Sequence, residues 1–211
     1  MKNISKTDHD NTMYLKHSLD FWIDHNKQHE EEAFNNEELK VKTLLEKYPD
    51  IRNTAIDIGS GGGWMCNKLK EYFDEVYGIE PSKKAIDLCR ELYKGKKIKW
   101  VHGYSEDAFE VINFPTKNVF INTCSVFIHL DDKYIIPTLK WINENFNNSI
   151  LSFQEFWSET IHINKPLHNC RTKQWWIDQL SNWDLDFHGP DLSSHGSQYT
   201  SLNKGIHGYI K

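Results

Sequence analysis

The 211-residue sequence predicts an α/β fold in which a mostly parallel sheet carries helices on both faces. Beyond residue 50, short apolar runs alternate with amphipathic segments of helical period. Such alternation of strand and helix implies parallel strands joined by right-handed crossovers. In addition, three consecutive glycines (61–63) follow the first apolar run. Glycine is favoured where the chain turns sharply or where a ligand approaches bare main chain.

The chain is expected to begin with helices. Apolar residues recur at helical spacing over 14–32, and a second helix is expected over 37–47, where Pro49 ends it. Residues 1–50 are therefore predicted to form a helical extension that caps a single domain, and residues 51–211 to form the main domain.

The main domain is expected to follow a regular order until about residue 153. Strands are predicted at 54–58, 75–79, 98–103, 118–124 and 149–153. Helices are predicted near 62–73, 82–94, 105–111 and 132–146. After a long connection, a helix is expected at 171–180, with strands at 183–189 and 205–211.

Composition excludes several classes of protein. With 38% hydrophobic residues the chain is globular, and its net charge of -5 argues against general nucleic-acid binding, which depends on basic residues. The sequence contains neither a secretory leader nor the roughly 20 apolar residues that span a bilayer, so a cytoplasmic protein is expected. The four cysteines form no C-x-x-C pair and are expected to be reduced core thiols.

The glycine loop "DIGSGGGW" excludes two familiar ligand loops. A Walker loop requires Lys and Ser or Thr after its last glycine, and neither follows here. A dinucleotide loop that starts at Gly59 requires its third glycine where Trp64 stands, and that side chain would keep helix and strand apart. The remaining pattern is an acid followed by alternating glycines: Asp57, Gly59, Gly61 and Gly63.

This pattern resembles the first motif of the class I (Rossmann-like) S-adenosylmethionine-dependent methyltransferases. Glu80 ends the second predicted strand about 20 residues after the loop. The segments "VHGYSEDAF" (101–109) and "NTCSVFIHLDD" (122–132) resemble the family's third- and fourth-strand loops. The resemblance covers residues 53–153, and implies a seven-stranded Rossmann-like methyltransferase fold that binds S-adenosyl-L-methionine and releases S-adenosyl-L-homocysteine.

The resemblance also implies roles for individual residues. The backbone of the glycine loop would pass under the methionine portion of the cofactor, and Glu80 would accept hydrogen bonds from both ribose hydroxyls. Asp57 would orient the loop or the cofactor's ammonium group; alternatively, it only caps the following turn. The expected cofactor-binding residues are Asp57, Gly59, Ser60, Gly61, Glu80, Pro81, Ser105, Glu106 and Thr123.

The adenine end departs from the family pattern. Where the family often has an Asp after the glycine of the third-strand loop, this chain has Tyr104. Three alternatives remain: Tyr104 stacks on the adenine, Glu106 or Asp107 reaches it, or backbone amides near Ser105 bind it. The third, with Glu106 nearby, is preferred.

A general base is needed if the acceptor is a hydroxyl or an ammonium group. His129 follows the fourth strand and titrates in the required range, although a capping or packing role is an alternative. Gln154, Glu155, His162 and His168 are further candidates. No metal site is expected, because these side chains lack the spacing of metal ligands.

The acceptor is expected to be a small molecule, such as a metabolite, a sugar or a sugar-linked intermediate. Enzymes that methylate nucleic-acid bases typically carry Asn/Asp-Pro-Pro-aromatic or Pro-Cys, and "NTCSVF" contains no proline. Neither a nucleic acid nor a membrane is expected as a partner. Two alternatives stay open: a non-catalytic subunit that binds the cofactor, and another reaction of the cofactor such as aminopropyl transfer or lyase chemistry.

Overall fold

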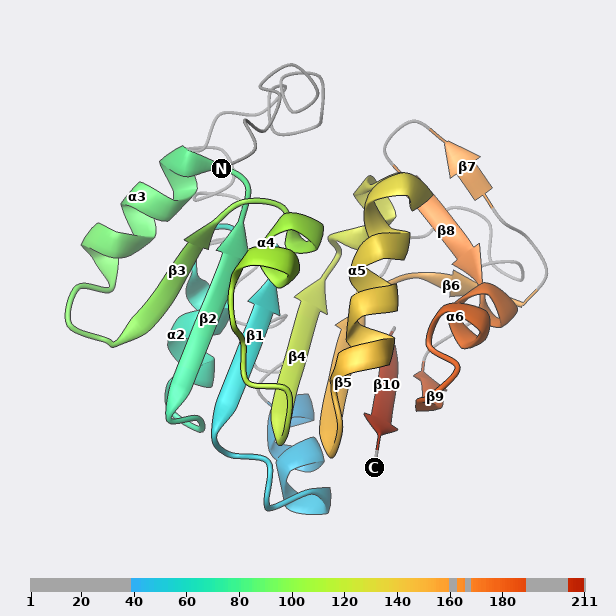
Figure 1. Cartoon of the computed structure of the whole chain (residues 1–211), viewed down its shortest axis with the longest axis horizontal. Coiled ribbons are helices and arrows are strands. Elements are labelled where there is room, and N and C mark those ends of the chain that lie inside the picture. Colours follow the sequence, from blue (N-terminus) through green and yellow to red (C-terminus); the bar gives the residue numbers. More distant parts are fainter. Residues whose placement is uncertain (1–38, 160–162, 166–167, 189–204, 211) are drawn as a thin grey trace.

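A computed structural model describes residues 39–159, 163–165, 168–188 and 205–210. Its centre is a seven-stranded sheet in the order β3-β2-β1-β4-β5-β10-β9 (Figure 1). The first five strands along the chain are parallel, and β10 runs antiparallel to both of its neighbours. The strands are β1 (Thr54–Ile58), β2 (Glu75–Glu80), β3 (Ile98–His102), β4 (Val119–Cys124), β5 (Ser149–Gln154), β9 (Asp184–His188) and β10 (Gly205–Ile210). The predicted fold class is therefore confirmed.

Helices lie on both faces of this sheet. In Figure 1, α4, α5 and α6 lie in front of the strands, while α2 and the helix over 39–47 lie behind them. The labelled helices are α2 (Trp64–Leu69), α3 (Lys83–Leu92), α4 (Ser105–Val111), α5 (Asp132–Asn145) and α6 (Lys173–Gln179). A short 3₁₀ helix, η2 (Phe127–His129), precedes α5.

Alternation along the strands divides the apolar residues between two cores. Ile56 and Ile121 enter the larger core, beneath α4, α5 and α6, whereas Ala55 and Phe120 enter the other core. All four side chains are fully buried. Burial on both faces explains why these strands read as continuous apolar runs in the sequence.

The segment predicted as a long connection forms a second, three-stranded sheet, in the order β6-β8-β7. Its strands are β6 (Trp157–Ser158), β7 (Ile163–Lys165) and β8 (His168–Thr172). β6 and β7 have only two and three residues, and β8 ("HNCRT") contains few apolar residues, so the sequence pattern missed these strands. In Figure 1, this sheet stands beside α6, at the end of the large sheet that carries the loop after β5.

The N-terminal prediction is covered only in part. The expected helix 14–32 lies outside the described residues, while 37–47 is helical over 39–47 and packs on the second core through Val41, Leu44 and Leu45. The division at residue 50 thus remains a prediction. Within the described ranges, no helix is both long enough and apolar enough to cross a bilayer.

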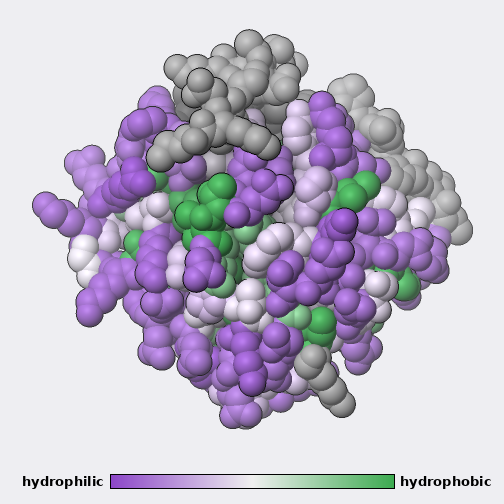
Figure 2. Space-filling view, viewed as in Figure 1, coloured by the Kyte–Doolittle hydropathy of each residue, from purple (hydrophilic) through white to green (hydrophobic). Residues whose placement is uncertain are grey.

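The visible surface is mainly hydrophilic. Figure 2 shows hydrophobic residues in separate patches among polar ones on the face covered by α4 and α5. The large hydrophobic side chains that stay exposed are scattered over different elements, for example Leu92 on α3, Val111 on α4 and Ile177 on α6.

Candidate functional site

The carboxyl ends of the parallel strands meet at one edge of the sheet. The strand order reverses between β1 and β4, which neighbour each other while their crossovers lead in opposite directions. In open α/β sheets, ligands bind in the crevice outside the strand ends at such a switch point. The loops after β1 and β4 flank that crevice here.

The glycine loop after β1 requires glycine for two different reasons. Gly59, Gly61 and Gly63 have φ values of 71°, 49° and 77°, a left-handed backbone that disfavours any Cβ. A Cβ at Gly59 would also lie 2.4 Å from Cγ2 of Val126, whereas a Cβ at Gly61 has no described atom within 4 Å. The loop is thus pressed against the chain after β4 at Gly59, and open space adjoins Gly61.

Glu80 links the end of β2 to this loop. Its side chain is 1% exposed; Oε2 accepts a hydrogen bond from the Gly61 amide at 3.0 Å and Oε1 one from the Ser82 amide at 2.8 Å. Burial is the main cause that raises the pKa of this carboxyl to about 7, and the nearby charge of Asp57 adds to it. Each oxygen of the ionised carboxylate retains further capacity to accept hydrogen bonds.

Asp57 lies at the end of β1 and is buried. Its Oδ1 accepts a hydrogen bond from Asn122 Nδ2 on β4 at 2.8 Å, and its Oδ2 one from Cys66 Sγ on α2 at 3.4 Å. Burial raises the pKa of this carboxyl to about 6, although both hydrogen bonds oppose the shift. The carboxylate thus ties β1, β4 and α2 together beside the glycine loop, and its role toward a ligand remains a prediction.

At the start of α4 the predicted adenine residues occupy distinct environments. Ser105 is buried and its hydroxyl shares a 2.8 Å hydrogen bond with the Thr138 hydroxyl. Oε2 of Glu106 is buried without a hydrogen-bond partner in the described part of the chain, and burial raises the pKa of this carboxyl. The ring of Tyr104 lies nearly parallel to that of Tyr134 on α5, with centroids 6.2 Å apart. Tyr104 is therefore already paired with an aromatic ring.

Pro81 follows Glu80 and is partly buried. Its carbonyl oxygen lies 3.0 Å from Nε2 of His102, the last residue of β3. This contact joins the ends of β2 and β3 near the predicted ribose site.

The end of β4 supplies both a buried and an exposed side chain. Thr123 is fully buried, and its hydroxyl donates to Glu155 Oε1 at 3.1 Å, so only its main chain is available to a ligand. Cys124, the last residue of the strand, is exposed. The expectation of four core thiols is therefore wrong for Cys124, although Cys66, Cys89 and Cys170 are buried thiols outside any disulfide.

His129 ends η2 and is half-buried, and its amide donates to the Val126 carbonyl at 3.0 Å. Two other candidate side chains are engaged elsewhere: Glu155 is fully buried among backbone amides, and Gln154 accepts a hydrogen bond from Lys40 Nζ at 3.1 Å. His162 lies outside the described residues, as does the side chain of His168. Of the candidates whose side chains are described, His129 is the one on the turn after β4, and its role as a base remains a prediction.

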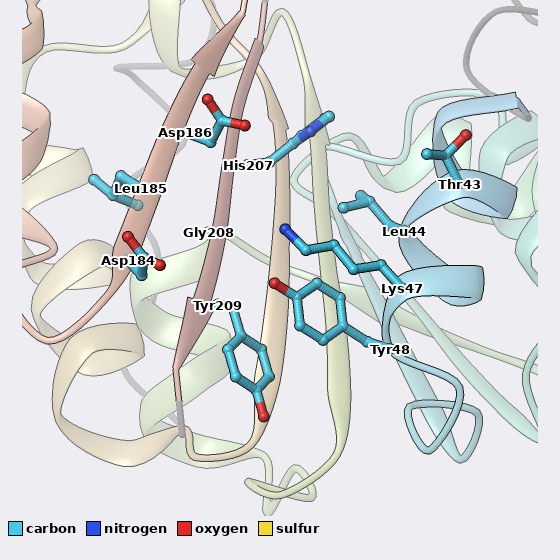
Figure 3. A pocket seen from close by; sticks show the side chains of 10 residues that line it. All are labelled: Thr43, Leu44, Lys47, Tyr48, Asp184, Leu185, Asp186, His207, Gly208 and Tyr209. Carbon is cyan, nitrogen blue, oxygen red and sulfur yellow. The ribbon is translucent and has the colours of Figure 1, made fainter.

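A cavity of about 480 Å³ lies elsewhere, between the helix over 39–47 and the strands β9 and β10. Figure 3 shows Lys47 and Tyr48 extending from the helix toward Tyr209 on the strand. Tyr209 pairs with Ile150 near the start of β5. The cavity therefore extends toward the amino end of β5, away from the carboxyl end that lies at the crevice. It is separate from the glycine loop.

Comparison with known proteins agrees with this geometry. The family described as "Methyltransferase domain" matches residues 56–135, which contain the glycine loop, Glu80 and His129. The chain is 28% identical over 89 residues to a polyamine aminopropyltransferase from Lachnospira eligens, covering 39% of this chain and 31% of that protein. It is 24% identical over 151 residues to ribosomal RNA small subunit methyltransferase G from Thermoanaerobacter, covering 56% and 63%. The chain thus spans about a third to two thirds of the length of these curated relatives.

A solved structure shares the fold over almost its whole length. It is an amino pentose methyltransferase from Micromonospora echinaspora, involved in calicheamicin biosynthesis, with S-adenosylmethionine bound. The TM-score is 0.66, the identity 8%, and the alignment covers 89% of this chain and 96% of that chain. At this identity the likeness shows the fold.

Proposed function

We propose that this chain, which belongs to the class I S-adenosylmethionine-dependent methyltransferases, methylates a hydroxyl or amine of a small molecule. The predicted family and cofactor are confirmed by the methyltransferase domain and by the shared fold. The observation that carries the proposal is the buried Glu80 carboxylate, which accepts from the Gly61 amide at the crevice beside β1 and β4.

The residues present fit S-adenosylmethionine. Open space adjoins Gly61, and the buried Ser60 hydroxyl has no hydrogen-bond partner among the described residues. The backbone from Gly59 to Gly61 would hold the methionine portion, and the free acceptor capacity of Glu80 would serve the ribose hydroxyls. Pro81, Ser105 and Glu106 would border the adenosine, and the main chain of Thr123 the ammonium group.

The bound cofactor supplies a methyl group on a sulfonium, which is an excellent leaving group. The chain's main task is then to align the acceptor and to exclude competing geometries. The turn after β4 is suited to this task, because Val126 packs directly against Gly59 of the cofactor loop. His129 follows Val126 by three residues on the same turn, and the proposal places it at this crevice.

His129 would remove the proton that a hydroxyl or ammonium acceptor must lose. Imidazole titrates near neutral pH, which suits a general base under ordinary conditions. Its amide is fixed to the Val126 carbonyl, so the residue is held at the end of η2. Thr123 and Glu155 are occupied with each other and do not compete for this role.

Two features support a small acceptor rather than a nucleic acid. The net charge of -5 disfavours a phosphate backbone, and the segment after β4 lacks the proline motifs of base methyltransferases. The ribosomal RNA methyltransferase among the relatives makes RNA the alternative that most needs testing.

The test is to incubate the purified chain with methyl-labelled S-adenosylmethionine and separate fractions of a cell extract. We expect label in the small-molecule filtrate, and none with Gly61→Val, whose side chain enters the space beside the loop. Label in the RNA fraction alone would show that the acceptor class is wrong. Cofactor binding without any transfer would favour the non-catalytic alternative. In a parallel incubation with decarboxylated S-adenosylmethionine, transfer of its aminopropyl group with release of methylthioadenosine would instead favour the chemistry of the aminopropyltransferase relative.

A further inference from the structure

The turn after β4 is held at its beginning by a buried carboxylate. Glu155, the residue that follows β5, is fully buried. Its Oε1 accepts hydrogen bonds from the amides of Val126 at 2.9 Å and Phe127 at 3.1 Å, and its Oε2 accepts one from Ile128 at 3.1 Å. A negative charge at the amide end of a helical turn is stabilising, because the unpaired N–H groups point toward it.

The end of the same turn is held by a buried guanidinium. Arg171, on β8 of the small sheet, is 1% exposed. Its Nη1 donates to the Phe127 carbonyl at 2.8 Å, its Nη2 to the Leu130 carbonyl at 2.7 Å, and its Nε to Asp132 Oδ1 at 2.8 Å. The fixed fork of a guanidinium matches several acceptors at once, which the single ammonium of lysine does not.

The turn between these charges touches the cofactor loop and carries the proposed base. The Val126 amide donates a hydrogen bond to Glu155. The Val126 side chain packs so closely on Gly59 that a Cβ added at Gly59 would lie 2.4 Å from Val126 Cγ2. His129 ends the same turn. A shift of the turn would therefore move Val126 and His129 together relative to the glycine loop.

We propose that Glu155 and Arg171 are positioning residues that hold the turn 126–130, and with it His129, in register with the cofactor loop. Burying two charges is costly, and apolar residues of similar size often stabilise a core as well or better. Here each charge binds backbone groups at one end of a single turn. The burial of these two charges is explained if the activity requires the backbone of the turn 126–130 at a fixed position. The inference rests on the proposed function of the crevice.

The test compares Glu155→Gln and Arg171→Lys with matched surface controls. Glu159 and Lys173 lie on the same segments and form an ion pair at 3.6 Å in which both side chains are exposed, so Glu159→Gln and Lys173→Arg serve as controls. In Glu155→Gln, the new NH₂ group faces an amide donor. A small misplacement of a catalytic group can cost about 10²-fold, so we expect kcat to fall roughly 10- to 100-fold in both test variants.

Two further readouts separate positioning from general damage. Affinity for S-adenosylhomocysteine should stay within about threefold of the unmodified chain, since the first three strand ends would hold most of the cofactor. Hydrogen exchange at the amides of 126–128 should accelerate in Glu155→Gln and not in Glu159→Gln. If Glu155→Gln does not fold, Thr123→Val removes one donor to Glu155 Oε1 and should show a smaller effect of the same kind.

Unchanged exchange would show that Glu155 does not hold the turn, and normal kcat despite faster exchange would show that the turn's position is immaterial. Equal losses of kcat and of cofactor affinity would place the effect on cofactor binding. Each of these results overturns the inference. If the unmodified chain transfers no methyl group, the proposed function and the catalytic part of this inference fail together. Exchange at 126–128 then still decides whether the carboxylate holds the turn.

Discussion

Cofactor affinity should depend on pH through Glu80. Ribose hydroxyls donate to this carboxyl best when it is ionised, and burial raises its pKa from 4.5 to about 7. With that pKa, about 9% of the group is ionised at pH 6 and about 91% at pH 8. If only the ionised form binds well, affinity for S-adenosylhomocysteine should rise roughly tenfold between these values, or about 1.4 kcal/mol.

Calorimetric titrations at pH 6, 7 and 8 measure this rise. Asp57, whose pKa burial raises to about 6, adds at most about a factor of two over the same range. Any titration of the ligand's amino group is the same for every variant. Glu80→Gln should therefore flatten the profile, and Glu75→Gln, an exposed position on the same strand, should keep it. Equal affinity at pH 6 and 8 in the unmodified chain, or an equal slope in Glu80→Gln, would refute the reasoning.

Further predictions concern the same crevice. Glu80→Ala should weaken cofactor binding by about 1.5–3 kcal/mol, the value of hydrogen bonds to a charged group. Calorimetry of the unmodified chain should detect no binding of NAD. Because the folded-state pKa of Glu80 lies above its ordinary value of 4.5, its contribution to stability is full below about pH 4.5 and is lost as the pH rises through about 7. Urea unfolding of the cofactor-free chain should show that loss, and Glu80→Gln should lack it. Gly59→Ala should destabilise by about 1–3 kcal/mol, through its positive φ and its contact with Val126, whereas Gly62→Ala, which meets no atom within 4 Å, should change stability little. His129→Ala should lower turnover roughly 10²–10⁴-fold at nearly constant cofactor affinity, and remove the rise of rate between about pH 5.5 and 7.5. Normal turnover with the same pH profile would make His129 a structural residue.

The sequence predicted the parallel half of the sheet well because four of its five strands, β1, β2, β4 and β5, are buried on both faces. The run predicted at 54–58 is β1, and the helix predicted at 105–111 is α4. The helix predicted near 62–73 begins only at Trp64, since Gly63 adopts a left-handed backbone with φ of 77°. Local patterns of this kind depend on neighbouring residues alone, so one sequence suffices to show them.

Contacts between distant segments left no such pattern. Arg171 follows Phe127 by 44 residues, and only the fold brings its guanidinium to that carbonyl. The Asn122 amide reaches Asp57 from the neighbouring strand β4, 65 residues further along the chain. The sequence indicates Glu155 as a candidate because it is an acid directly after a strand, but a general base and a residue that binds backbone amides have the same sequence pattern. Burial and hydrogen-bond partners distinguish the two roles.

A crystal structure of the chain with S-adenosylhomocysteine tests the location of the site most directly. We predict ribose hydroxyls within hydrogen-bond distance of Glu80, the homocysteine portion along Gly59–Gly61, and His129 as the titratable side chain nearest the sulfur. A ligand bound instead in the cavity beside Lys47 and Tyr209, or one that leaves Glu80 without contact, would contradict the account.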